Sequence, residues 1–354
     1  MAMAPQALYA GFTIFKLLRM YLIFWVVYNA LRSGTDPRAV LYGLIAMGLL
    51  FLFTVLRQKY MQGYYRIPGP FDHSNTVPLY LHPVLPALLV WSLVEPKLRP
   101  GVRALGVLGA LGMLFAVQST FSRAGLVLAV LGVLGALGIA NMRARSKRVT
   151  WVSALLLRGF VLGGIKAAPS FIERIRNAPP SSHEARSEFN HAATLMAHDR
   201  FLGVGLNNFA YVLTNTPAYN AHITVMADER ESGFGVCHQI YLLTVAELGV
   251  PGLVLFLLVL WRFEGFALRR WWRGRRKRGD VLAMVAGGYA VGFLALHGQG
   301  MLEWAFRITP VLIQFSIAAA AVTAFAELPQ AERQRVEGAA LDGPQLDLQE
   351  TPPS

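Results

Sequence analysis

The sequence predicts an all-α, polytopic membrane protein. Of its 354 residues, 55% are hydrophobic, and the mean hydropathy is +0.44. Apolar windows of about 20 residues recur along the chain, which is the length that a helix needs to cross a bilayer. The alternation of apolar and polar residues that membrane β-strands require is missing. These observations exclude a soluble fold and a membrane β-barrel.

Nine hydrophobic segments are predicted to span the membrane. They are residues 8–31, 39–56, 77–95, 102–120, 124–141, 149–168, 238–262, 281–299 and 303–326. Together they define a membrane domain over residues 1–326. The remaining residues, 327–354, are rich in Pro, Gln, Glu and Asp and poor in large apolar side chains, so we expect a disordered cytoplasmic tail.

Basic residues concentrate in three of the connecting loops. These loops, around residues 97–103, 143–148 and 262–280, all lie on one side of the membrane by the order of the spans. Cytoplasmic loops carry the excess of Lys and Arg, so this side is predicted to be cytoplasmic. The arginine-rich stretch 269–278 is interpreted as an anchor on anionic lipid, and no nucleic-acid partner is expected.

One long polar segment interrupts the hydrophobic chain and is predicted to lie on the outer side. Residues 169–236 contain seven acidic and five basic side chains, and no apolar run there is long enough to span a bilayer. The segment leads into His238, at the start of the seventh predicted span. Gly249-Val-Pro251-Gly252 is expected to break or kink that span halfway across. A histidine placed in this way indicates a site at the boundary between water and lipid.

Three side chains are candidates for chemistry on the outer face. Arg123 follows Phe121-Ser122 between the fourth and fifth spans, and Arg186 belongs to the polar segment. Guanidinium groups bind phosphate oxygens through paired hydrogen bonds, so both arginines are predicted to hold an oxyanion such as pyrophosphate. His238 is predicted to act as a general base, because a neutral imidazole accepts a proton from a hydroxyl near neutral pH.

A simpler interpretation of each residue stays open. Arg123 could reach the lipid headgroups, Arg186 could be a solvated surface charge, and His238 could only anchor a helix end. If His238 has that anchoring role, Glu303 is the next candidate base. The single cysteine, Cys237, excludes a disulfide within the chain, and no histidine spacing is typical of a zinc site. No metal and no cofactor is therefore expected.

Four short motifs follow one another between residues 66 and 262. They are Gly69-Pro-Phe-Asp-His-Ser-Asn75, Phe121-Ser122-Arg123, Arg200-Phe-Leu-Gly203-Val-Gly205-Leu-Asn-Asn208-Phe209 and His238-Gln239-x9-Gly249-x2-Gly252. In this order they resemble the signature of the O-antigen ligase/polymerase family of bacterial membrane glycosyltransferases. The chain departs from the family at Arg200, where a proline is usual, and in having fewer predicted helices. We interpret the smaller number of predicted helices as a shortened N-terminal region.

The resemblance implies a GT-C-like, metal-independent enzyme of cell-surface polysaccharide or lipopolysaccharide biosynthesis. Such an enzyme moves a glycan from undecaprenyl pyrophosphate to an acceptor hydroxyl, which belongs to the lipid A core for a ligase and to another glycan for a polymerase. The family pattern assigns pyrophosphate binding to Arg123 and Arg186 and activation of the acceptor to His238. The active site would face the periplasm from the bacterial inner membrane.

The competing function is a membrane transporter of a small anion or solute. Many helices and outward-facing arginines are also expected of such a protein. A transporter of this kind would carry ionisable side chains through the middle of the membrane. The polar residues of this sequence gather on one face instead, which favours the transferase.

Overall fold

The structure, a computed structural model, describes residues 6–143, 147, 149–159, 180–221, 223, 235–275 and 280–341. These residues form helices and no strand, and seven of the helices are long and apolar enough to cross a membrane. The seven are α1 (Ala7–Arg32), α2 (Arg38–Leu56, extended by the π-helix η1, Arg57–Met61), α5 (Pro100–Ser119), α6 (Arg123–Arg143), α12 (Ile240–Gly274), α13 (Val281–Gly300) and α14 (Thr309–Leu341). The prediction of an all-α, polytopic membrane protein is confirmed.

Two of the predicted spans take a different form. The segment 77–95 is divided into α3 (Thr76–Leu81) and α4 (Leu85–Val94). Two prolines, Pro83 and Pro86, lie at the division, and each lacks the N–H that a continuous helix would use. The segment 149–168 is described only as the helix Val149–Gly159, and its remaining residues lie outside the described part of the chain.

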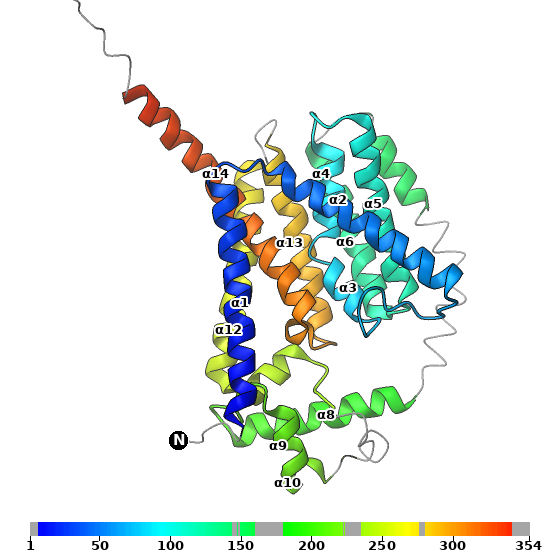
Figure 1. Cartoon of the computed structure of the whole chain (residues 1–354), viewed down its shortest axis with the longest axis vertical. Coiled ribbons are helices and arrows are strands. Elements are labelled where there is room, and N and C mark those ends of the chain that lie inside the picture. The colour runs from blue at the N-terminus through cyan, green and yellow to red at the C-terminus, as the bar shows by residue number, and fades with distance from the viewer. Residues whose placement is uncertain are drawn as a thin grey trace, which may run out of the picture.

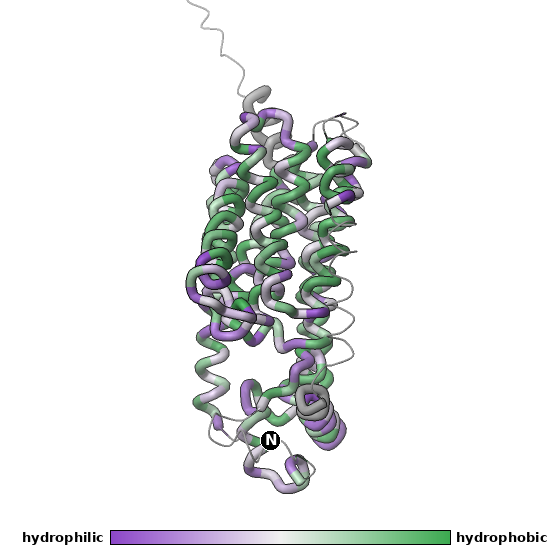
Figure 2. Tube along the Cα trace, turned by 90° about the vertical axis from the view of Figure 1, so that its right-hand side faces the viewer, coloured by the Kyte–Doolittle hydropathy of each residue, from purple (hydrophilic) through white to green (hydrophobic). Residues whose placement is uncertain are grey.

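The polar segment lies at one end of the helical bundle. Its described helices are α8 (Pro180–Asp199), α9 (Phe209–Asn215) and α10 (Pro217–Asn220), and the N-terminal end of α1 reaches the same end (Figure 1). Figure 2 shows hydrophobic residues along the long helices and hydrophilic residues toward both ends of the bundle. The connection from α4 to α5 and the C-terminal end of α12, which carry basic residues, lie at the opposite end (Figure 1).

Helix α12 is kinked where the sequence predicts it. Gly249 has φ 68° and ψ −174°, which are not helical values, and Pro251 follows inside the helix. The prediction of a kink in this span is confirmed. The helix then continues beyond residue 262 to Gly274, so the first part of the arginine-rich stretch is helical.

The glycine-rich motif that precedes the histidine docks onto this kink. Gly205 donates its N–H to the carbonyl of Glu247 at 2.8 Å, and Val250 donates to the carbonyl of Phe201 at 3.1 Å. A Cβ atom at Gly249 would lie 2.0 Å from the Phe201 oxygen, so only glycine permits this approach. The motif therefore joins the polar segment to the start of α12.

The last span begins later and ends later than predicted. Residues 303–308 form a loop with a short 3₁₀ turn, η2 (Ala305–Arg307), and α14 starts at Thr309. Because α14 continues to Leu341, residues 327–341 are helical where the sequence predicted disorder. The residues after 341 lie outside the described part of the chain. Glu303 is consequently a loop residue at the α8 end of the bundle.

Candidate functional site

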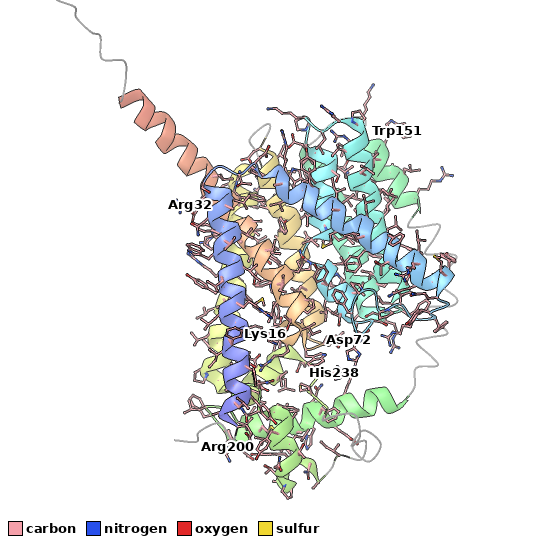
Figure 3. All side chains as sticks on the ribbon, viewed as in Figure 1. Lys16, Arg32, Asp72, Trp151, Arg200 and His238 are labelled. Carbon is pink, nitrogen blue, oxygen red and sulfur yellow. The ribbon has the colours of Figure 1, made fainter. Side chains whose placement is uncertain are left out.

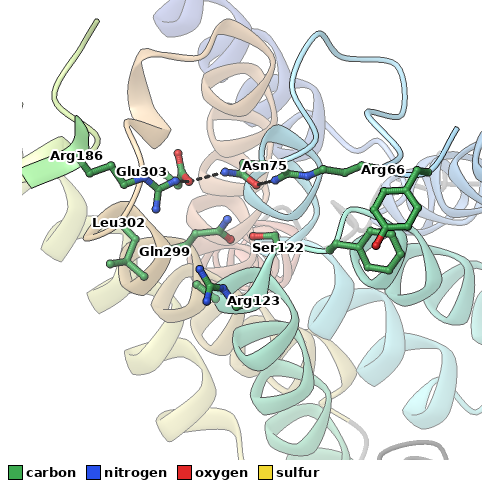
Figure 4. Close-up of a pocket in the computed structure, with 11 residues that line it drawn as sticks. Arg66, Asn75, Ser122, Arg123, Arg186, Gln299, Leu302 and Glu303 are labelled. Atoms are coloured by element: carbon green, nitrogen blue, oxygen red, sulfur yellow. Dashed lines mark hydrogen bonds and ion pairs between the residues drawn. The ribbon is translucent and has the colours of Figure 1, made fainter. Parts of the chain in front are cut away.

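A cavity of about 550 Å³ lies at the end of the bundle that faces α8 (Figure 4). It is formed where α5 ends, α6 begins and α13 ends, and helix α8 contributes one residue. Its lining residues are Tyr65, Arg66, Asn75, Phe121, Ser122, Arg123, Ala124, Arg186, Gln299, Leu302 and Glu303.

The cavity brings the three predicted site residues together. Arg123, the first residue of α6, and Arg186 on α8 both line it. His238 lies two residues before α12, between the bundle and α8 (Figure 3). Its Nδ1 atom is 3.3 Å from Oε2 of Glu303, which is a lining residue. His238 is not itself a lining residue, and its imidazole is connected to the cavity through the Glu303 carboxylate.

Glu303 is the centre of the polar contacts. Its Oε1 atom accepts hydrogen bonds from Arg186 at 2.9 Å and from the Asn75 amide at 2.6 Å, while Oε2 faces His238. Asn75 in turn accepts a hydrogen bond from Arg66 at 2.5 Å, so four side chains form a continuous chain (Figure 4). The Glu303 side chain is only 7% exposed. A buried carboxylate held in this way has a fixed orientation.

The lining carries an excess of positive charge. Three guanidinium groups, those of Arg66, Arg123 and Arg186, face the single carboxylate of Glu303. Arg66 and Arg186 are hydrogen-bonded within the network, whereas the Arg123 guanidinium has no hydrogen-bond or ion-pair partner among the described residues. A cationic pocket at the membrane boundary attracts anions, and a planar guanidinium suits phosphate oxygens.

The turn before α6 sets the position of Arg123. Phe121 has φ 56°, a left-handed conformation that is uncommon for a bulky residue, and its ring lies 5.1 Å from that of Tyr65. Ser122 follows, and its hydroxyl accepts the N–H of Gly125 at 3.4 Å, as a helix-capping serine does. Strained residues of this kind concentrate at functional sites, because the surrounding contacts hold them there.

The first of the four motifs supplies Asn75. Gln58 exchanges two hydrogen bonds with the backbone of Gly69, at 2.6 and 3.0 Å, and Gly69 has φ 67°. Arg66 is tied to the end of α5 through the carbonyl of Thr120 at 2.8 Å. These contacts fold the segment 66–75 over the cavity.

Several lining residues are absent from the predicted site. Arg66 and Asn75 belong to a segment recognised as a motif, but nothing local indicated that Asn75 binds Glu303 or that Arg66 binds Asn75. Glu303 itself was predicted only as an alternative base. Gln299 carries no signal in the sequence, because an amide on an apolar helix has no distinguishing spacing.

Cys237, next to the histidine, packs as expected of a small side chain. Its thiol is fully buried and donates to Oδ1 of Asn190 at 3.1 Å. Burial raises the pKa of this thiol to about 12, so it stays protonated and is a poor nucleophile. We therefore assign the chemistry of this region to the side chains around Cys237 and not to its thiol.

A comparison with protein families matches the middle part of the chain. A family model described as O-Antigen ligase matches residues 108–257, while no curated protein matches the chain. The matched region runs from α5 into α12 and contains Arg123, Arg186, His238 and the kink at Gly249. The order of the four motifs and the all-helical membrane fold agree with this match, which supports an O-antigen ligase domain over residues 108–257.

Proposed function

We propose that the protein transfers a glycan from undecaprenyl pyrophosphate to an acceptor hydroxyl at the cavity described above. The observation that carries this proposal is the position of Glu303, which contacts His238 with one oxygen and Arg186 with the other. Glu303 lies beside Arg123, whose guanidinium has no partner among the described residues. One site thus combines a candidate base with cations suited to a phosphate leaving group.

The arginines are assigned to the donor. In the transfer, the bond between the sugar C1 atom and the pyrophosphate oxygen breaks, and its electron pair stays on that oxygen. Arg123 stabilises this negative charge, and Arg186, whose side chain is 42% exposed, can turn from Glu303 to a phosphate oxygen. Fixed donors that face a developing charge contribute strongly to catalysis in a site shielded from water.

His238 is assigned to the acceptor. The Glu303 carboxylate accepts a hydrogen from Nδ1, which leaves the lone pair of Nε2 for a proton. As the acceptor oxygen bonds to C1, its proton moves to Nε2. The products are the glycosylated acceptor and polyprenyl pyrophosphate, so the step needs neither a metal nor another cofactor.

The acceptor is proposed to be the lipid A core or another glycan, and the site is proposed to open to the periplasm from the inner membrane. The described basic residues of the α4–α5 connection and of the end of α12 support this orientation, because these segments lie at the end opposite α8. Reporter fusions at residues 146 and 215 should give opposite compartment signals. Equal signals would contradict this topology.

A complementation experiment tests the transferase itself. A strain lacking the gene should lose its surface glycan and accumulate the lipid-linked precursor, and the wild-type gene should reverse both changes. The His238→Ala gene should reverse neither while the protein is still inserted in the membrane. A deletion strain with normal surface glycan, or with no accumulated precursor, would contradict the proposal.

A further inference from the structure

We infer that Gln299 is an additional substrate-binding residue, whose side-chain amide donates a hydrogen bond to the pyrophosphate of the donor. This inference rests on the proposed function, since it names a further contact in the same cavity. Gln299 is the penultimate residue of α13, and its side chain lines the cavity together with Arg123 and Glu303 (Figure 4).

The orientation of the amide is set from behind by a histidine. Oε1 of Gln299 lies 2.6 Å from Nε2 of His82, and both residues are buried. An amide oxygen can only accept, so the histidine nitrogen carries the hydrogen of this bond. The amide nitrogen of Gln299 is consequently directed away from His82.

That nitrogen is a buried donor that lacks a protein acceptor. Nε2 of Gln299 has no hydrogen-bond partner among the described residues, and the residue is fully buried. Buried polar groups are nearly always hydrogen-bonded, because leaving a donor unsatisfied is unfavourable. An oxygen atom of a ligand in the cavity would satisfy it.

The packing of α13 explains why His82 and Gln299 meet. Gly288 and Gly292 are four residues apart, on the face that packs against α4 and the His82–Pro83 turn before it. A Cβ atom at Gly292 would lie 2.6 Å from the carbonyl oxygen of His82, so this close approach depends on glycine. Gln299 follows Gly292 by seven residues, which is two helical turns, and therefore shares its face.

The surrounding charges indicate that the Gln299 amide binds the pyrophosphate of the donor and not its sugar. Arg66, Arg123 and Arg186 supply donors to the same cavity, so a ligand at this position must be rich in acceptor oxygens. A pyrophosphate has only acceptors when it is ionised, whereas each sugar hydroxyl also brings a donor. The amide of Gln299 thus completes a set of donors for one anion.

Binding of inorganic pyrophosphate to the purified full-length protein tests the inference. Isothermal titration calorimetry would compare the wild type with Gln299→Met, which keeps the length of the side chain and removes its amide. Arg123→Met reports on the proposed donor site as a whole. Gln314→Met is the matched control, because Gln314 is also buried, lies on α14 and is not a lining residue.

We expect Gln299→Met to weaken binding about tenfold to a hundredfold, as for a lost hydrogen bond to a charged group. Arg123→Met should weaken it too, and Gln314→Met should not. If Gln299→Met does not fold, Gln299→Glu provides the same test, because it can still accept from His82 and sets a carboxylate against the anion.

The two proposals fail in different ways. Wild-type affinity in Gln299→Met, together with weak binding in Arg123→Met, would overturn the role of Gln299 and leave the donor site in place. A wild-type protein that does not bind pyrophosphate, or an Arg123→Met variant that binds it normally, would overturn the donor site itself.

Discussion

Two glutamates of this chain each pair with an arginine at the same end of the bundle, yet their surroundings differ. Glu303 pairs with Arg186, and its other contacts are the side chains of Asn75 and His238. The arginine is 42% exposed, and both partners border a cavity. The Arg186 side chain can therefore leave Glu303 and bind another ligand without disrupting the fold.

The second pair joins backbone segments. Glu247 pairs with Arg307, and its carboxylate also accepts the backbone N–H groups of Asn207 at 2.9 Å and Phe209 at 3.2 Å. The exposed fractions are 3% for Glu247 and 14% for Arg307. The carbonyl of Arg307 is in turn bound by Lys16 of α1 at 2.8 Å, which accounts for a lysine within a hydrophobic helix.

The comparison separates a binding site from its support. Glu247 is bound by main-chain groups of one loop and by a buried arginine, so it fixes the glycine-rich motif against α12. Arg307 lies only four residues after Glu303, and the same pair thus fixes the loop that carries Glu303. An acidic residue that contacts backbone supports the architecture here, whereas one that contacts side chains at a cavity is suited to chemistry.

The largest effect is expected at the histidine that Glu303 orients. His238→Ala should lower the rate of glycan transfer by about 10² to 10⁴-fold, the usual contribution of a general base. His198→Ala is the matched control. The imidazole of His198 also faces a carboxylate, that of Asp199, at 3.3 Å, but it is 87% exposed.

The measurement is glycan transfer from a lipid-linked donor by each purified variant, with folding checked by thermal unfolding. A chelator should leave the activity of wild type and His198→Ala unchanged. Full transfer by His238→Ala would reduce the histidine to a helix anchor.

Removal of Glu247 should instead damage the fold. Glu247→Ala leaves Arg307 as a buried, unpaired charge and two N–H groups without their acceptor, at an expected cost of about 3–5 kcal/mol of stability. Denaturant or thermal unfolding in detergent measures the change. A variant as stable as the wild type would show that this pair does not support the loop.

The same substitution at Glu303 should have the opposite outcome. Glu303→Ala should lower transfer at least about tenfold to a hundredfold, the loss known for a carboxylate that orients a metal-bound imidazole. Stability should change little, because Arg186 is partly exposed and water can solvate it. A large loss of stability with normal transfer in the residual folded protein would erase the distinction between the two glutamates.

Much of the fold was predictable, because the length and hydropathy of a membrane helix are local properties. The break at Pro83 follows from local chemistry as well. The end of α14 was predicted wrongly, since residues 327–341 are polar but rich in Ala, Glu, Gln and Arg, which favour a helix that has already started. Low hydropathy identified the end of a span there, not the end of a helix.

The candidate site residues were predictable only where a motif or the polar segment marked them. Arg123 and His238 stand in motifs, and Arg186 in a polar segment, so the sequence indicated all three. The contact between Asn75 and Glu303 joins residues 228 positions apart, and no local pattern reports such a pair. The position of Gln299 depends on how closely two glycines let α13 approach α4 and the His82–Pro83 turn, which is a property of packing.

The smallest effect is expected where charge is kept and only geometry is lost. Arg123→Lys should weaken the binding of inorganic pyrophosphate about tenfold, because an ammonium cannot reproduce the paired hydrogen bonds of a guanidinium. Arg200→Lys is the control: Arg200 lies away from His238 and does not line the cavity (Figure 3). Titration calorimetry at low and high salt separates the two contributions, since the remaining lysine binds through charge alone and is more strongly screened. Equal affinities of Arg123→Lys and the wild type at both salt concentrations would mean that the cavity binds the anion by charge alone. The paired hydrogen bonds assigned to Arg123 would then be ruled out.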